Sequence, residues 1–343
     1  MAGAECYVGW ADTCKGSAMQ ESHWLDEAIA HLRNIRGTRS RHQQLKARLV
    51  NVQAGIRDEM GTFEIEVDLS ELADHAKKAV SGCSLIRALA SFAQLHRSPK
   101  PEDLRAKARK AAQRSPLLAM MSSTTHDSEG KVVARSPGVA SDEASEDGGL
   151  RRMMLQEEAF RRGIAANGLI EPARLSIQAE HPVEERDLLP LMQRSPFVPP
   201  EREMIFTRAF ARFFGGDHMS AIHLLFPQLE NSMRHLLKHS GCDPTSLKAD
   251  RTQQDIKISL MIKDYRLEIE RIFGPAVVLE IENLFDAQDG PSVRHSVAHG
   301  LLNQSAFDNN DCIYACWFVF RLCVLPLLSD WQRVEADYDR LTR

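Results

Sequence analysis

Three side chains that can act on a phosphate group lie in one short stretch near the C-terminus, Val293-Arg-His-Ser-Val-Ala-His-Gly300. Arg294 carries a permanent charge, and its planar guanidinium can donate two hydrogen bonds to phosphate oxygens. The imidazole of histidine titrates near neutral pH, so His299 can give or take a proton, with His295 assisting. We expect Ser292 to cap a helix here, whose first N–H groups would favour an anion.

These groups are sufficient to cleave an RNA phosphodiester. The 2′-hydroxyl of the substrate is the nucleophile, a base removes its proton, and a cation stabilises the charge that develops on the phosphate oxygens. A chain of this composition contains an Arg-x4-His pair by chance, and Arg234-His-Leu-Leu-Lys-His239 has the same spacing. Spacing alone therefore does not choose between the two pairs.

The residues around Arg294 resemble the HEPN superfamily of helical-bundle domains. Its hallmark is an arginine, a polar residue, three variable residues and a histidine, the order found from Arg294 to His299. With Gly300 the stretch is similar to the RNxxxHG signature of the DUF4209 branch, which includes the eukaryotic endoplasmic reticulum membrane-associated RNA degradation protein family. That branch usually has Asn after the arginine, whereas His295 stands here, as in other HEPN groups.

A second stretch carries the same resemblance. Pro227, Glu230 and Arg234 have the spacing of the Pro-x-x-Glu-x-x-x-Arg helix that precedes the motif in that branch, and the resemblance covers residues 202–328. It implies a homodimer in which two sets of Arg294 and His299 meet in one cleft. It also implies cleavage of RNA without a metal ion or other cofactor.

Each of these residues also has an interpretation without catalysis. Arg294 can be a capping cation and His299 a satisfied core histidine. Glu230 and Arg234 are either an exposed i, i+4 ion pair or a pair that orients His299 or binds the RNA backbone.

Metal binding is the weaker alternative. His295 and His299 have the i, i+4 spacing of metal ligands, but Ser296 replaces the glutamate of HExxH and no third ligand is evident. The seven cysteines are scattered and contain no CxxC pair, which favours reduced thiols over a disulfide framework.

A net charge of −4 gives the chain no general attraction to nucleic acid, so a phosphate-binding surface must be a local patch. One basic run can track a phosphate backbone or form a solvated helix face. The run comprises Arg105, Lys107, Arg109, Lys110 and Arg114.

Apolar residues at helical spacing predict the elements that position the motif. One stripe runs from Ile222 to Leu237, with Pro227 as a kink or a start, and a second runs from Val277 to Phe285. Val293, Val297 and Leu301 continue at i, i+4 after the turn, and an apolar helix begins at about Asp311. Short connections between these helices predict an antiparallel bundle.

We therefore expect an all-α protein in four parts. A helical N-terminal region covers 1–121, and 122–149, rich in Ser, Asp, Glu and Gly, is a disordered linker or loop. A helical connector with a Pro-rich break covers 150–200. A HEPN-like antiparallel bundle covers 201–343.

The most apolar stretch, 312–328, is interrupted by Arg321 and Pro326, so we expect a buried helix and no membrane insertion. The N-terminal residues lack a basic start followed by an apolar run, so we expect no signal peptide and a cytoplasmic protein.

The favoured function is a metal-independent endoribonuclease, in the context of defence or RNA degradation. Arg294 would bind the scissile phosphate, His299 would be the general acid or base and His295 would assist, with Glu230, Arg234 and Ser292 in support. The alternatives are an RNA-binding module without catalysis, a helical scaffold, and a metal-dependent hydrolase.

Overall fold

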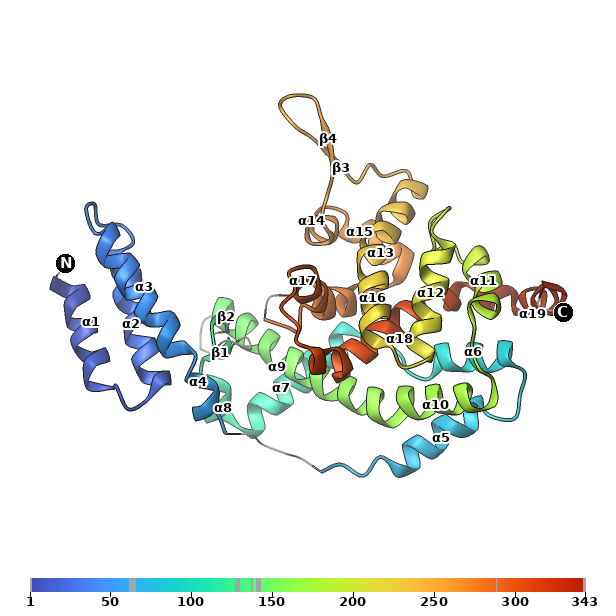
Figure 1. Ribbon diagram of the computed structural model, residues 1–343, viewed down its shortest axis with the longest axis horizontal. Coiled ribbons are helices and arrows are strands. Elements are labelled where there is room, and N and C mark those ends of the chain that lie inside the picture. Colours follow the sequence, from blue (N-terminus) through green and yellow to red (C-terminus); the bar gives the residue numbers. More distant parts are fainter. Residues whose placement is uncertain are drawn as a thin grey trace. The chain divides into compact units, whose positions relative to one another are not determined.

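The computed structural model describes residues 2–61, 66–126, 130–136, 138–139, 143–287 and 289–341. The chain forms two compact units, which are treated separately (Figure 1). Unit 1 consists of Met1–Val67 and Ser122–Pro137, and unit 2 of Asp68–Met121 and Gly138–Arg343. Over the described ranges the secondary structure is helical apart from two short antiparallel hairpins, so the all-α prediction is confirmed.

Unit 1 is a small helical unit with one hairpin. Its elements are α1 (Ala2–Thr13), α2 (Ala18–Leu32), α3 (Arg39–Gln53), α4 (Ile56–Glu59), β1 (Ser123–His126) and β2 (Val132–Ser136). α2 packs against both α1 and α3. Leu25, Leu32 and Leu45 are buried between these helices. Ser17 caps α2 by accepting a hydrogen bond from the N–H of Gln20.

Unit 2 contains the remaining elements. They are α5 (Ser70–Val80), α6 (Leu85–Gln94), α7 (Pro101–Arg114), α8 (Pro116–Met120), α9 (Glu143–Ala165), the π-helical turn η1 (Ala166–Ile170), α10 (Glu171–Glu180), α11 (Glu185–Arg194), α12 (Glu203–Phe214), α13 (His218–His239), β3 (Thr245–Leu247), β4 (Gln253–Asp255), α14 (Ile258–Asp264), α15 (Arg266–Phe273), α16 (Pro275–Ile281), the π-helical turn η2 (Glu282–Asp286), α17 (Val293–Ala298), the 3-10 turn η3 (Gln304–Asp308), α18 (Asn310–Val324), the 3-10 turn η4 (Leu325–Asp330) and α19 (Trp331–Leu341). The β3–β4 hairpin projects away from the helices (Figure 1).

The core of unit 2 is built around α18. This helix packs against α6, α9 and α13, and every residue from Cys312 to Val324 is buried. The indole N–H of Trp317 donates to the carbonyl of Phe92, 2.8 Å away, which satisfies the one polar group that its burial would leave unpaired. The helix expected from about Asp311 is thus the central element of a helical bundle.

By length and composition, the segment Asn310–Tyr338 is apolar enough to cross a membrane. Its most apolar window is 78% buried inside the protein. The core helix of a globular fold has the same composition, because it too is surrounded by apolar side chains.

The expected domain boundaries differ from the units of the structure. The sequence predicts that residues 68–121 belong to the N-terminal region, but α5, α6 and α7 are part of unit 2. The reason is packing at long range. The ring of Phe92 in α6 lies 5.7 Å from that of Phe320 in α18, a contact between residues far apart in the chain that no local pattern reveals.

The stretch 122–149, expected as a disordered linker or loop, contains regular structure. Strands β1 and β2 pair with Ser123 opposite Ser136 and Thr125 opposite Ala134, and α9 already begins at Glu143. Each strand has two adjacent β-branched residues, Thr124 and Thr125 in β1 and Val132 and Val133 in β2, and such residues favour extended backbone.

Four segments of unit 2 meet at a buried carboxylate, Glu280 of α16, which is 1% exposed. It accepts hydrogen bonds from Tyr314 of α18, with the oxygens 2.5 Å apart, from Arg161 of α9 and from Ser98 after α6. Burial raises the pKa of Tyr314 well above its ordinary value, so its hydroxyl stays a donor. These bonds hold α16 in place, and η2 continues directly from α16.

Arg161 compensates this charge. It donates to both carboxylate oxygens of Glu158, at 2.8 and 2.9 Å, and to the Nε2 atom of His96. An Nε2 that accepts a hydrogen bond carries no proton. Burial, with Arg161 next, lowers the pKa of His96 to about 4.

The neutral state of His96 predicts an acid sensitivity. The unfolded chain takes up a proton near pH 6.5 and the folded chain only near pH 4, so stability present above pH 6.5 is lost as the pH falls towards 4. His96→Gln, which keeps an acceptor for Arg161, should remove this loss of about 3 kcal/mol. Urea unfolding between pH 7 and pH 4 measures it.

His223→Gln, at an exposed histidine of α13, serves as the control and should keep the wild-type pH profile. If His96→Gln and wild type lose stability in parallel, His96 is not held neutral by Arg161.

Candidate functional site

The Arg294 motif forms a single short helix, α17, with a defined stop. Ser292 precedes it with φ 41°, in the left-handed region, and its side chain caps no N–H group. The expectation that Ser292 caps this helix is therefore wrong. The physical reason is the backbone of Ser292, which is left-handed rather than extended as in a capping serine.

Gly300 has a physical reason to follow His299. It adopts φ 64°, and the helix ends with two bonds, from Gly300 N–H to the Val297 carbonyl at 3.1 Å and from Leu301 N–H to the Ser296 carbonyl at 2.8 Å. This is the pattern of a glycine-terminated helix, since glycine adopts positive φ without strain. The stop also turns Leu301 out of the apolar stripe that was expected to include it, and Leu301 is 51% exposed.

Glu230 joins the two arginine segments. α13 runs without interruption through Pro227 and brings Glu230 opposite α17. The Oε2 atom of Glu230 accepts from Nε of Arg294 at 3.1 Å and from its Nη2 at 2.6 Å. Its Oε1 atom accepts from Nη1 of Arg234 at 2.8 Å. One carboxylate therefore orients both guanidinium groups.

Arg234 is held more fully than Arg294. Its side chain is 14% exposed, and it also donates to the carbonyl of Ile256 at 3.2 Å and lies 3.7 Å from a carboxylate oxygen of Asp255. The Arg294 side chain is 22% exposed, and within the described residues its Nη1 makes no hydrogen bond. Arg234 is thus a structural partner of Glu230, whereas Arg294 keeps donors for a ligand.

His295 and His299 lie side by side on the surface. Their ring centroids are 4.3 Å apart at an angle of 49°, and both side chains are exposed. The interpretation of His299 as a buried core histidine is therefore wrong. The hydrogen bonds of Glu230 go to Arg294 and Arg234, and within the described residues none joins it to His299, so its expected role in orienting His299 finds no support.

A cavity of about 290 Å³ opens beside Arg294. Its walls come from α13 and α17, and His299 is not among them. The lining residues are Phe226, Pro227, Glu230, Arg294, Val297 and Ala298. Arg294 therefore stands between a small, mostly apolar hollow and the surface that carries the two imidazoles.

Asp286, which the sequence analysis did not single out, belongs to the same site. It ends η2, and burial raises its pKa, against the effect of Arg294 and with that of Glu282 and Glu230. A carboxyl group that shares its surroundings with Arg294 can hold or release a proton there. The only signal in the sequence is its position at the end of the apolar stripe before the Asp289 turn.

The second Arg-x4-His pair has similar local geometry. The rings of His235 and His239 lie 4.2 Å apart, but burial and then His239 lower the pKa of His235. Its arginine, Arg234, is the one held by three partners. The two pairs that spacing could not separate are thus distinguished by the surroundings of the arginine.

Among the described residues no group of three or more His, Cys, Asp or Glu side chains is arranged to hold a metal ion. The structure brings Arg294, Glu230 and Arg234 together and pairs His295 with His299.

Comparisons with protein-family models, with curated proteins and with solved structures find no match.

The shared carboxylate gives a stability prediction. Glu230→Gln removes the carboxylate that pairs with the partly buried Arg294 and leaves Arg234 only the more distant Asp255, which should lower the free energy of unfolding by about 1–3 kcal/mol. Urea denaturation of the full chain measures it. Glu185→Gln is the matched control, because Glu185 pairs with Arg208 at 3.5 Å on the surface, and it should cost less than about 0.5 kcal/mol. An equal loss of unfolding free energy in the two variants would show that Glu230 stabilises the fold no more than a surface ion pair does.

Proposed function

We propose that the protein is a metal-independent endoribonuclease of the HEPN type that acts in the cytoplasm as a homodimer. The observation that carries the proposal is the pair of exposed imidazoles on the same short helix as a guanidinium that is oriented by Glu230. The resemblance of 294–300 to the HEPN motif supports the same activity.

Arg294 binds the scissile phosphate in this proposal. Nε and Nη2 remain on Glu230, while Nη1 is directed to the phosphate oxygens, so that binding does not require the Glu230 pair to break. A guanidinium that is already oriented loses little side-chain entropy when it binds. The charge that develops on the phosphate oxygens is then stabilised by a preorganised cation.

The two imidazoles supply the proton transfers. One neutral imidazole takes the proton from the 2′-hydroxyl, whose oxygen attacks phosphorus as the bond to the 5′-oxygen breaks. The other, as imidazolium, gives its proton to the leaving 5′-oxygen. The products are a 2′,3′-cyclic phosphate, or its hydrolysed form, and a 5′-hydroxyl. His299 is the principal acid or base and His295 assists.

A second copy of the chain completes the site. Residues five positions apart on a helix are rotated by about 140° around its axis, so Arg294 and His299 of one chain face different directions. In a dimer, His299 of one protomer can approach the phosphate held by Arg294 of its partner. This geometry requires both residues in the assembled enzyme.

The test is incubation of structured and unstructured RNAs with purified protein in EDTA. Wild type should cleave, and His299→Ala and Arg294→Ala should each lower the rate at least about 100-fold, the scale of lost acid–base or electrostatic catalysis. His239→Ala removes the equivalent histidine of the second Arg-x4-His pair and should cleave like wild type.

Cleavage that survives His299→Ala would contradict the proposal. If wild type leaves every RNA intact but binds it, and Arg294→Ala and His299→Ala weaken binding together, the site is an RNA-binding module instead. Activity that appears only without EDTA would favour a metal-dependent hydrolase. Loss of stability in both variants without any RNA affinity would favour a helical scaffold.

A further inference from the structure

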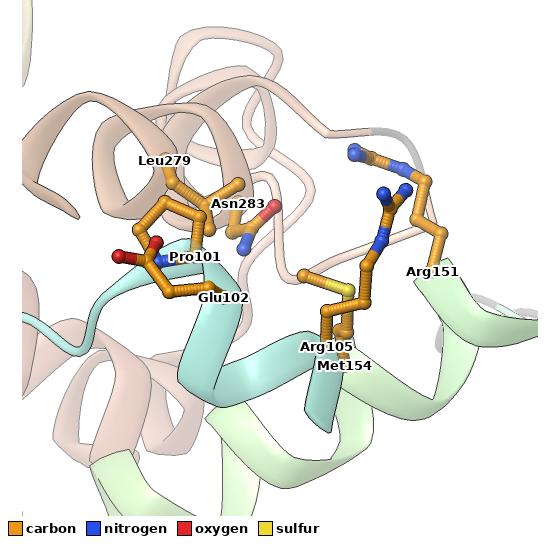
Figure 2. A pocket seen from close by; sticks show the side chains of 7 residues that line it. All are labelled: Pro101, Glu102, Arg105, Arg151, Met154, Leu279 and Asn283. Carbon is orange, nitrogen blue, oxygen red and sulfur yellow. The ribbon is translucent and has the colours of Figure 1, made fainter. Parts of the chain in front are cut away.

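We propose that unit 2 has a second ligand site, for a nucleoside monophosphate, in a hollow of about 540 Å³ between α7, α9 and the α16–η2 segment. The lining residues fall into a cationic end, a buried amide and an apolar wall. Figure 2 shows these side chains around the hollow.

Two arginines form the cationic end. Arg105 comes from α7 and Arg151 from α9, and Figure 2 shows their guanidinium groups next to each other on one side of the hollow. Nε of Arg151 lies 3.4 Å from a carboxylate oxygen of Asp289, which holds the side chain in this direction. A phosphate can accept hydrogen bonds from two neighbouring guanidinium groups at once, which suits an anion at this end of the hollow.

Asn283 is the polar group that points to a ligand. It belongs to η2, is 2% exposed, and its side chain points into the hollow (Figure 2). In the part of the chain that the structure describes, its amide makes no hydrogen bond. Because this amide faces the hollow, a ligand that offers both a donor and an acceptor, as the edge of a nucleobase does, can pair with it.

The remaining wall suits a flat, apolar group. Pro101, Met154 and Leu279 line it, and Figure 2 places Glu102 on the side opposite the two arginines. A carboxylate there accepts a hydrogen bond from an exocyclic amino group of a base and repels a second phosphate. The hollow is therefore complementary to a nucleoside monophosphate. Its cationic end suits the phosphate, and the rest of its wall suits a neutral base.

The size of the hollow agrees with this ligand. Pockets for small molecules and cofactors have volumes of about 300–1,000 Å³. The site does not depend on the proposed nuclease activity, because none of its lining residues belongs to the Arg294 site. The monophosphate can be a free nucleotide or the 5′-terminal nucleotide of an RNA, and competition separates these sources.

Titration calorimetry of the full chain with AMP tests the proposal. Wild type should bind AMP, and Arg105→Gln and Arg151→Gln should each weaken binding at least about tenfold, the effect of one lost charged hydrogen bond. Arg109→Gln, one turn further along the exposed side of α7, is the matched control and should bind like wild type. Adenosine, which lacks the phosphate, should bind at least about tenfold more weakly than AMP.

A 5′-phosphorylated tetranucleotide RNA is the competing ligand. Displacement of AMP would assign the site to RNA ends, and failure to displace it would assign the site to free nucleotides. Equal affinity for adenosine and AMP, or unchanged AMP binding in both arginine variants, would overturn the proposal, as would the absence of AMP binding. An inactive nuclease that still binds AMP would count against the proposed function alone.

Discussion

The structure of unit 2 depends on the buried carboxylate of Glu280. It lies where α9, α16, α18 and the segment after α6 meet, and Arg161 neutralises it. A charge so deeply buried is tolerated only with its partners in place, so these elements can assemble in one arrangement. The position of α16 then determines that of η2, which carries Asn283 at one hollow and Asp286, whose pKa is raised by burial and lowered by Arg294.

Glu230, like Glu280, is a carboxylate bound by more than one side chain, but it lies nearer the surface. It binds two arginines, but they are less deeply buried, and within the described residues Nη1 of Arg294 makes no hydrogen bond. The deeper carboxylate therefore joins elements of the core, whereas the shallower one orients the guanidinium that the proposed function assigns to the phosphate. π-helical turns are frequent at functional sites, and η2 connects these two regions.

Local patterns predicted the helices and their buried faces, because apolar periodicity depends on near neighbours alone. They also singled out Arg294 and His299, whose role in catalysis stays a prediction. They missed the grouping of α5 to α7 with unit 2 and the ion network of Arg161, since both depend on contacts between residues distant in the chain. Asp286 was missed for the same reason: its pKa is shifted by burial and by Arg294 and Glu230, which come from other elements. The prediction that Ser292 caps α17 was wrong because Ser292 adopts a left-handed backbone conformation.

The most direct test of the nuclease account is the identity of the product ends. Mass spectrometry of RNA fragments released by the wild-type protein in EDTA should find 5′-hydroxyls together with 2′,3′-cyclic phosphates or the monophosphates derived from them. These ends require the ribose 2′-oxygen as the nucleophile, as expected when imidazoles and a guanidinium act on the phosphate. Fragments with 3′-hydroxyl and 5′-phosphate ends would require attack by water and would contradict the account.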